Sequence, residues 1–391
     1  MDIQKIAKEM EQYVIEMRRD FHRYPEMPLK EVRTCKRICE ELDLAEIPYE
    51  IIGKYNVIAH LKFGDGKKLA IRADMDALPI QEELNVEWKS RNDGVMHACG
   101  HDAHTAILLA TAKGLLKMRK SLTGEIYLCF QEAEEIGKCA DECVEYLSAK
   151  GGVDGVIALH VQSGVEAGKI DIKPGTRCSG SEIFYIDITG KGGHGSRPDL
   201  VIDPVEVACD IYQKLKTISV YSHNPFNTIV VSPCMLSGGN RFNVFPDTAH
   251  IEGTIRYFKI GDGDLVLEHI RKICRTSAEL YGAKVEVSNA CAAKYPVINE
   301  KSSAERALLV AKRIGFEEAD EEPSAGSDNF AEFLYAFPGC YCNIGSKSKR
   351  KGSSDKHHSA CFDLDESVLP KSVEFFLSYA IEFLKKETIS E

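Results

Sequence analysis

The chain has 391 residues, a formal net charge of −11 and an apolar content of 44%. This length exceeds one ordinary hydrophobic core, so two domains are expected, one of them interrupted by the other. The acidic balance argues against a nucleic-acid partner, because phosphate binding needs a clustered basic surface. No apolar run approaches the ~20 residues that span a bilayer, so we expect no membrane partner. We expect a cytoplasmic protein whose 14 cysteines stay reduced.

The first half of the chain alternates between helix and strand patterns. Helices are predicted over residues 3–22, 30–44, 105–118 and about 139–149. Strands are predicted over residues 59–63, 68–75, 124–131 and 154–161. This alternation is typical of an α/β fold, in which helices cover both faces of a layered sheet.

The pattern changes near residue 178. The elements predicted there are, in order, a strand ending in glycines, a helix over 204–216, two strands over 227–235 and 248–258, a helix over 264–281 and a strand over 283–290. This β-α-β-β-α-β order predicts a self-contained α+β sandwich. We therefore expect a catalytic α/β domain, residues 1–177 plus 292–391, that is interrupted by a smaller domain, residues 178–291. The chain ends in an amphipathic helix over 366–386.

The stretch Gly94–Ala106 holds three histidines and a cysteine within eight residues. Cys99 and His101 lie in a glycine-containing turn before the helix predicted to begin near Thr105. Such a turn can direct two side chains at one point, and a helix N-terminus favours a thiolate. Two ligands alone are equally typical of a histidine-rich helix start. His97 and His104 are expected to support the turn or the helix face.

Further carboxylates and imidazoles follow other predicted strands. These are Asp74 and Asp76, Glu134 and Glu135, His160, and His357 with His358. Taken alone, the acidic pair would be a solvated helix start and the strand-end histidine a structural residue. Taken together, they bring several ligand types to successive strand ends of one sheet, where open α/β sheets bind their ligands. Two adjacent acids can divide the work, one holding a metal and the other moving a proton.

The motifs also occur in a familiar order. They are FHRYPE, RADMDALP, MHACGHDAHTA, QEAEE, ALHV, KGGHGSRP, GGNRFNVFPDTAHIEGTIR, GSDNF and HHSACFDLDE. This set resembles the M20 metallopeptidase family along nearly the whole chain. It is most similar to the amidohydrolase branch, which includes hippurate hydrolases, plant auxin-conjugate hydrolases, N-acyl-amino-acid deacylases and diaminopimelate deacetylases.

The resemblance implies a role for each matching residue. The implied metal ligands are Cys99, His101, Glu135, His160 and His358. His358 is chosen over His357 because it stands four residues before Phe362, as the ligand does in the family pattern. Glu134 matches the general base, and Asp76 matches an aspartate that supports the site. Five ligands including a thiolate imply two divalent metal ions, which the donor types allow to be Zn²⁺, Mn²⁺, Co²⁺ or Ni²⁺.

The inserted domain contributes three further residues through the resemblance. KGGHGSRP lacks the Lys-Ser/Thr end of a phosphate-binding loop, and its glycines let His194 project from a tight turn. In similar enzymes this histidine polarises the scissile carbonyl, often across a dimer interface, so a homodimer through the inserted domain is expected. Asn243 and Arg256 match substrate-binding positions, and Arg256 could grip a carboxylate with two parallel hydrogen bonds. Without the family, they would be a turn asparagine and a strand arginine.

Three positions depart from the family pattern. Glu132 replaces the proline of the usual QPAEE and is expected to add acid near the site. Asp328-Asn329-Phe330 stands where the family has Glu-Asp-Phe, in a loop that resembles a substrate-facing one. HHSACF also lacks the usual proline. None of these changes touches a metal ligand, so activity is expected, but they weaken any transfer of substrate identity.

The sequence thus predicts a metal-dependent amidohydrolase that cleaves N-acyl amino acids to a carboxylate and a free amino acid. Its partner would be a small N-acyl amino acid or short peptide. The alternatives are a dipeptidase or carboxypeptidase with the same dinuclear site, an N-acetyl-diaminopimelate-type deacetylase, and a non-catalytic metal-binding or ligand-binding relative. The last would be expected to have lost a ligand or the base, and this chain keeps all six.

Overall fold

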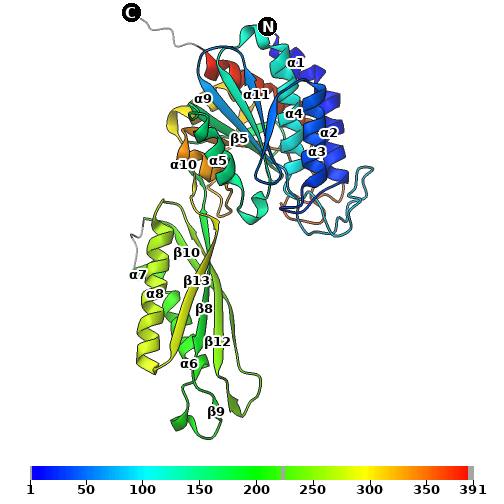
Figure 1. Cartoon of the computed structure of the whole chain (residues 1–391). Helices are drawn as coiled ribbons and strands as arrows, with labels where there is room; N and C mark the ends of the chain where they lie inside the picture. Colours follow the sequence, from blue (N-terminus) through cyan, green and yellow to red (C-terminus); the bar gives the residue numbers. More distant parts are fainter. Residues whose placement is uncertain (1, 222–223, 225, 386–391) are drawn as a thin grey trace, which may run out of the picture. The chain divides into compact units, whose positions relative to one another are not determined.

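The computed structural model describes residues 2–221, 224 and 226–385, and the chain forms two compact units (Figure 1). The first unit comprises Met1–Arg177, Ile298–Glu322 and Asn329–Glu391. The second comprises Cys178–Val297 and Pro323–Asp328. The sequence places the second boundary after residue 291, whereas the last long strand of the second unit, β13, continues to Ala293.

The first unit is built on a mixed eight-stranded sheet. Across the sheet the strands are β1 (Tyr49–Ile52), β2 (Asn56–Lys62), β4 (Glu125–Gln131), β3 (Lys68–Asp74), β5 (Gly155–Gln162), β16 (Gly339–Gly345), β6 (Lys169–Asp171) and β15 (Glu317–Glu318). The central strands β4, β3, β5 and β16 are parallel. Their carboxyl ends therefore meet at one edge, which is where ligands bind in open α/β sheets.

Helices cover both faces of this sheet, as Figure 1 shows. The helices of the unit are α1 (Ile3–Glu9), α2 (Glu11–Arg23), α3 (Val32–Leu44), α4 (His101–Lys117), α5 (Ala140–Ala149), α9 (Lys301–Arg313), α10 (Phe330–Ala336) and α11 (Val368–Leu384). Ile71, Leu128 and Ile157 of the central strands are fully buried, and burying each such side chain stabilises the fold by about 2 kcal/mol. Within the described residues, no helix has the length and apolarity to cross a bilayer.

Two helix predictions differ from the structure. The helix predicted over 3–22 is divided in two, because Met10 is the junction at which α1 ends and α2 begins. The helix predicted to start near Thr105 begins at His101 instead. Its N-cap is Gly100 in the left-handed region, with φ +93, and no side chain caps the helix. The usual capping signal in the sequence is therefore absent.

The second unit has a four-stranded antiparallel sheet with two long helices on one face. The strand order is β10 (Ile229–Gly238), β12 (Thr248–Tyr257), β8 (Gly180–Thr189) and β13 (Lys284–Ala293). The covering helices are α6 (Pro204–Leu215) and α8 (Asp262–Tyr281), which contact each other and the sheet. Every second residue of β12 is buried, as expected for a sheet with one covered face. This arrangement confirms the predicted α+β layer and its element order.

Candidate metal centre

The Cys99-Gly100-His101 turn places two predicted ligands at the start of α4. Gly100 has a positive φ, and a Cβ at this position would lie 2.3 Å from Val161 Cγ2. Only glycine fits such a close approach of turn and strand. The turn consequently packs directly against β5, the strand that carries His160.

Asp76 fixes the orientation of two predicted ligands at once. His101 Nδ1 lies 3.1 Å from Asp76 Oδ1, and the Glu135 backbone N–H donates to Asp76 Oδ2 at 2.9 Å. A carboxylate behind a histidine in this way directs the other ring nitrogen toward a metal. The position of Asp76 agrees with its predicted supporting role.

His101 Nε2 and Glu135 Oε1 face each other across 3.8 Å. Both atoms are buried, and neither has a hydrogen-bond partner among the described residues. Burial raises the pKa of Glu135. Buried polar atoms without partners are costly, so this pair is an observation that fits a cation held between the two side chains.

Cys99 and His160 form the next part of the cluster. Cys99 Sγ lies 3.5 Å from His160 Nε2, while His160 Nδ1 lies 2.7 Å from the Val161 carbonyl oxygen. Burial holds the pKa of His160 well below its usual value, so the ring is neutral. With Nδ1–H donating to the carbonyl, Nε2 offers a lone pair. Burial and Glu135 raise the pKa of Cys99, so its thiolate requires a cation.

The two neighbouring histidines of the C-terminal loop have different surroundings. His358 adopts a left-handed φ of 59, and its backbone N–H donates to the Ala98 carbonyl at 2.8 Å. Its Nε2 lies 3.5 Å from Glu135 Oε2. His357 is mostly buried, and its Nε2 accepts from the Ser163 N–H at 3.3 Å. The structure therefore places His358, the predicted ligand, against the carboxylate.

The five predicted ligands converge in two overlapping sets. Within each set, one ligand atom per residue lies within 4.8 Å of the others, and Cys99 belongs to both. The sets are Cys99, His101 and His160, and Cys99, Glu135 and His358. Thiolate, imidazole and carboxylate donors suit Zn²⁺, Mn²⁺, Co²⁺ or Ni²⁺. The five side chains together would be able to hold divalent cations.

Glu134 lies beside these ligands in the short 3-10 turn after β4 (Glu134–Ile136). One of its carboxylate oxygens lies within 4.8 Å of ligand atoms of His101 and Glu135. The Asn329 backbone N–H donates to Glu134 Oε1 at 3.3 Å. The predicted general base is thus adjacent to the predicted ligands without belonging to either of the two sets.

The sequence did not reveal the side-chain hydrogen bonds that hold Asn329 in place beside Glu134. Asn329 Oδ1 accepts from Arg72 Nη2 at 2.9 Å and from Gln131 Nε2 at 2.8 Å. Asn329 is buried, and its side chain belongs to this network. Arg72 Nη1 also donates to Asp74 at 2.5 Å. No short sequence motif signals these pairs, because the residues are far apart in the chain.

His104 and His97 contribute to the surroundings of the cluster. His104 Nδ1 lies 2.6 Å from Asp74 Oδ1, and its Nε2 accepts from the Val161 N–H at 2.9 Å. Both ring nitrogens are therefore engaged, which agrees with the predicted supporting role. His97 is buried, and burial lowers its pKa to about 3.

The Glu132 carboxylate forms hydrogen bonds with the backbone of the turn between β1 and β2. Its Oε1 accepts from the backbone N–H groups of Lys54 at 3.2 Å and Tyr55 at 2.7 Å, in the turn between β1 and β2. Neither predicted ligand set includes Glu132. Its Oε1 is therefore held by that turn, while Glu132 stays three residues before Glu135 in the chain.

The second unit brings two of its three predicted residues together. His194 in β9 (Gly193–His194) pairs with Val244 of β11 (Val244–Phe245), and the Gly195 N–H donates to the Asn243 carbonyl at 2.9 Å. Both His194 and Asn243 are exposed. Arg256 lies near one end of β12, opposite Ser181. The β9–β11 pair lies near the other end of β12, where Thr248 pairs with Thr189.

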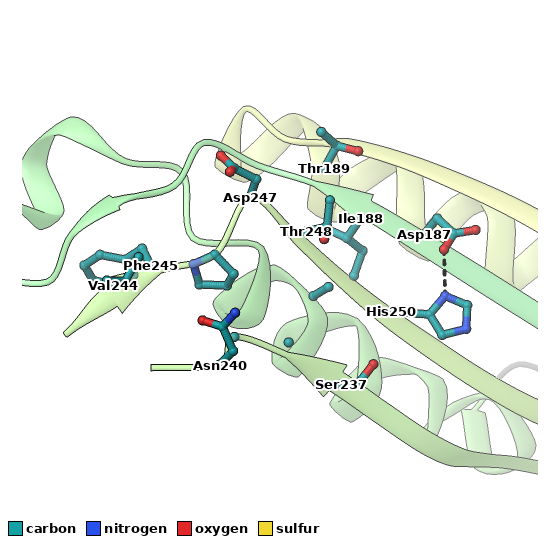
Figure 2. Close-up of a pocket in the computed structure, with 14 residues that line it drawn as sticks. Asp187, Ile188, Thr189, Ser237, Asn240, Val244, Phe245, Asp247, Thr248 and His250 are labelled. Carbon is teal, nitrogen blue, oxygen red and sulfur yellow. Dashed lines mark hydrogen bonds and ion pairs between the residues drawn. The ribbon is translucent and has the colours of Figure 1, made fainter. Parts of the chain in front are cut away.

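The same unit also contains a hollow of about 760 Å³ (Figure 2). Its walls come from β8, β10, β11 and β12, and it includes His250, whose Nδ1 lies 2.6 Å from Asp187 Oδ1. None of the predicted metal ligands lines it. The hollow is therefore separate from the cluster in the first unit.

Comparisons with known proteins agree with this geometry. Residues 70–382 match the model of peptidase family M20/M25/M40. N-acetylcysteine deacetylase from Bacillus subtilis is 35% identical, covering 95% of this chain and 97% of that protein. Thermostable carboxypeptidase 1 from Saccharolobus solfataricus is 33% identical, covering 97% and 98%. The crystal structure of Bacillus subtilis YXEP, a dinuclear metal binding peptidase from the M20 family, has a TM-score of 0.83 at 34% identity, covering 96% and 99%.

The match to the family model begins at residue 70, whereas the two relatives cover 97% and 95% of this chain. The relatives include both a deacetylase and a carboxypeptidase, so they share a hydrolytic reaction class but differ in substrate. The order of motifs, the fold and the cluster of ligands agree with that class. The chain belongs to the M20 peptidase family of metal-dependent hydrolases.

Proposed function

We propose that this protein hydrolyses the amide bond of N-acyl amino acids, releasing a carboxylate and a free amino acid. The observation that carries the proposal is the convergence of two overlapping ligand sets beside Glu134. Two divalent cations, when bound by the five ligands, would polarise the amide carbonyl and make water more acidic. The remaining chemistry belongs to the protein's own side chains.

Glu134 is the proton carrier in this proposal. Its carboxylate accepts a proton from the attacking water and delivers it to the leaving nitrogen, so one group serves as base and then as acid. The Asn329 backbone N–H donates to one oxygen of this carboxylate at 3.3 Å and so helps to orient it. Asp76 keeps His101 and Glu135 in place throughout.

We assign His194 to the oxyanion of the scissile carbonyl, the adjacent Asn243 to a second contact with the substrate, and Arg256 to the substrate carboxylate. Burial lowers the pKa of Arg256, and no ion pair involves it among the described residues, which suits an anionic ligand. Arg256 lies eight residues from Thr248 along β12, which is roughly 27 Å of strand. His194 and Arg256 of one copy therefore cannot reach the same small substrate. This separation supports a homodimer in which each copy supplies one of them.

The competing function is that of a carboxypeptidase or dipeptidase. It is favoured by the 33% identity to the Saccharolobus solfataricus carboxypeptidase, which is comparable to the 35% identity to the deacetylase. Both activities need the same cluster and the same grip on a substrate carboxylate. They differ only in whether the acyl side carries an amino group.

The deciding experiment measures amine release from N-acetyl, N-benzoyl and longer N-acyl amino acids beside a set of dipeptides. The protein is stripped with chelator and assayed with and without Mn²⁺, Zn²⁺, Co²⁺ or Ni²⁺. We expect metal-restored cleavage of N-acyl amino acids at a higher kcat/KM than any dipeptide. Faster cleavage of dipeptides would establish the peptidase instead, and metal-independent cleavage would contradict both.

A further inference from the structure

A second group of potential ligands lies in the first unit, outside the five residues described above. It comprises Glu132, Cys139 and Glu142, whose ligand atoms lie within 4.8 Å of one another. Glu132 ends the strand-to-turn connection after β4, Cys139 immediately precedes α5, and Glu142 lies in the first turn of that helix. The family pattern usually has proline at position 132, so the group depends on a departure from that pattern.

Glu132 supplies the observation that points to a ligand. Its side chain is fully buried, with a relative exposure of 0%. Oε1 is satisfied by the N–H groups of Lys54 and Tyr55, but Oε2 has no hydrogen-bond partner among the described residues. A buried carboxylate oxygen without a partner is unfavourable unless something else binds it. The neighbouring thiol and second carboxylate lie where a cation would contact all three.

The group also carries more negative charge than its surroundings balance. Lys54 directs its ammonium to the Leu29 carbonyl, and no ion pair involves Glu132 or Glu142 among the described residues. Asn56 Nδ2 donates to Glu142 Oε2 at 2.8 Å, which is a neutral contact. Burial and then Glu132 raise the pKa of Glu142, and burial with both glutamates raises the pKa of Cys139 to about 12. A bound cation would reverse these penalties and release protons.

We propose that Glu132, Cys139 and Glu142 form a third cation site, separate from the dinuclear centre, that takes Zn²⁺ or a similar thiol-binding divalent ion. One thiolate and two carboxylates are a donor set that Zn²⁺ accepts, with water completing its coordination. A hard ion such as Mg²⁺ or Ca²⁺ is disfavoured, because these ions prefer oxygen donors alone.

The site would bind both ends of the segment that presents Glu134 and Glu135. This segment includes two non-glycine residues with positive φ, Ala133 at 58 and Cys139 at 66. Such conformations are strained and persist only where the surroundings hold them. A cation bridging Glu132 and Cys139 holds the segment from the side opposite the active site. The role is structural, so the site is not required for proton transfer itself.

The stoichiometry of bound Zn²⁺ provides the first test. The full-length protein is loaded with Zn²⁺, passed through a desalting column and analysed for metal and protein. We expect wild type to retain one more Zn²⁺ per chain than Cys139→Ser or Glu132→Gln. The matched control, Glu145→Gln, changes an exposed acid on the same helix and should retain the wild-type value. Equal retention in wild type and both cluster variants would overturn the proposal.

Cobalt spectroscopy provides the second test and separates the two thiols. Co²⁺ bound to a thiolate gives an intense near-ultraviolet charge-transfer band, and Cys99 of the dinuclear centre would contribute one as well. In a Cys99→Ser background we expect a residual band that disappears in Cys99→Ser/Cys139→Ser. Absence of the band in Cys99→Ser alone would contradict the site. Both measurements depend on differences between variants, so they hold whatever substrate the enzyme cleaves.

The Glu142→Gln variant distinguishes loss of a metal ligand from loss of the fold. The amide can still accept from Asn56 but offers a weaker, uncharged ligand. We expect this variant to keep the wild-type circular dichroism spectrum and to bind Zn²⁺ at the third site at least tenfold more weakly. A folded Glu142→Gln protein with unchanged Zn²⁺ affinity would count against the proposal.

Discussion

The predicted site residues of the two units differ in how their own surroundings hold them. In the first unit, His101, Glu135 and His160 are each oriented by a hydrogen bond to an identifiable partner. In the second unit, His194 and Asn243 are exposed. His194 Nδ1 lies 2.8 Å from the Oγ and 3.2 Å from the backbone N of the neighbouring Ser196.

The degree to which side chains are held in place reflects the different needs of metal binding and substrate binding. A metal centre must be organised before the ion arrives, since every ligand that needs reorienting costs affinity. Groups that contact a substrate can stay solvated until the substrate binds. The first unit therefore carries its chemistry within its own contacts, whereas the residues of the second unit acquire a role only with a substrate and, as we propose, a second copy.

Replacing Glu134 by Gln tests the first unit most directly. The amide cannot take a proton from water, so kcat should fall by about 10²–10⁴-fold. Bound metal, measured by elemental analysis, should stay at the wild-type level because the five proposed ligands are unchanged and glutamine conserves the size of the side chain. Glu87→Gln, at an exposed position, serves as the control. Retained turnover in Glu134→Gln would remove the proposed base.

Replacing His194 by Ala tests the second unit. Losing a donor to the oxyanion should reduce kcat by about 10²–10³-fold while metal content is unchanged. If each copy supplies His194 to its partner, mixing Glu134→Gln with His194→Ala should restore activity, since some mixed dimers contain one intact site. No recovery after verified subunit exchange would exclude the shared arrangement.

Asp76→Ala should loosen the metal centre without removing a ligand. The substitution frees both the His101 ring and the Glu135 backbone N–H, so metal affinity should fall about 10–100-fold. Competition with a chromophoric chelator measures this change, and Asp93→Ala, an exposed aspartate, is the control. An unchanged affinity would show that the ligands hold their positions without Asp76.

The smallest effect is expected at His250 in the second unit. Burial opposes its charge, but hydrogen bonds that the ring donates to Asp187 and Glu252 outweigh burial and raise the pKa above 6.5. The stabilisation from this histidine is therefore full below pH 6.5 and is lost as the pH rises through the folded-state value. Compared with His250→Gln, wild type should be more stable by less than about 1 kcal/mol at pH 5.5 and equally stable at pH 9. Urea unfolding measures both, and a difference that stays constant with pH contradicts the assignment.

The sequence indicates the central strands β3, β4 and β5 well, whereas the central strand β16 and the edge strand β1 were not predicted. β3 and β4 are long apolar runs, so their positions and the residues at their carboxyl ends were predictable. The edge strand β1 has only four residues and no buried side chain, so hydrophobic periodicity cannot reveal it. The sequence also does not indicate that the helix is divided at Met10, because neither glycine nor proline stands there.

The candidate site shows the same limit. The ligands were identifiable because the order of motifs resembles a known family, and no ligand pair alone would have been sufficient. The hydrogen bonds of Asn329 were missed because its partners are distant in sequence: Arg72 is 257 residues away and Gln131 is 198. A buried network of this kind depends on how strands and loops meet, which local patterns do not encode.

The tight approach at Gly100 has a consequence for anyone who would evolve this enzyme toward other substrates. Any side chain there meets Val161 and also demands a backbone conformation that L-residues avoid. Shortening Val161 relieves the collision but leaves the strained backbone, so no single compensating change reopens the position. A library that randomises residues 99–101 would therefore return glycine at its centre, and diversity is better placed in the exposed β9–β11 pair of the second unit.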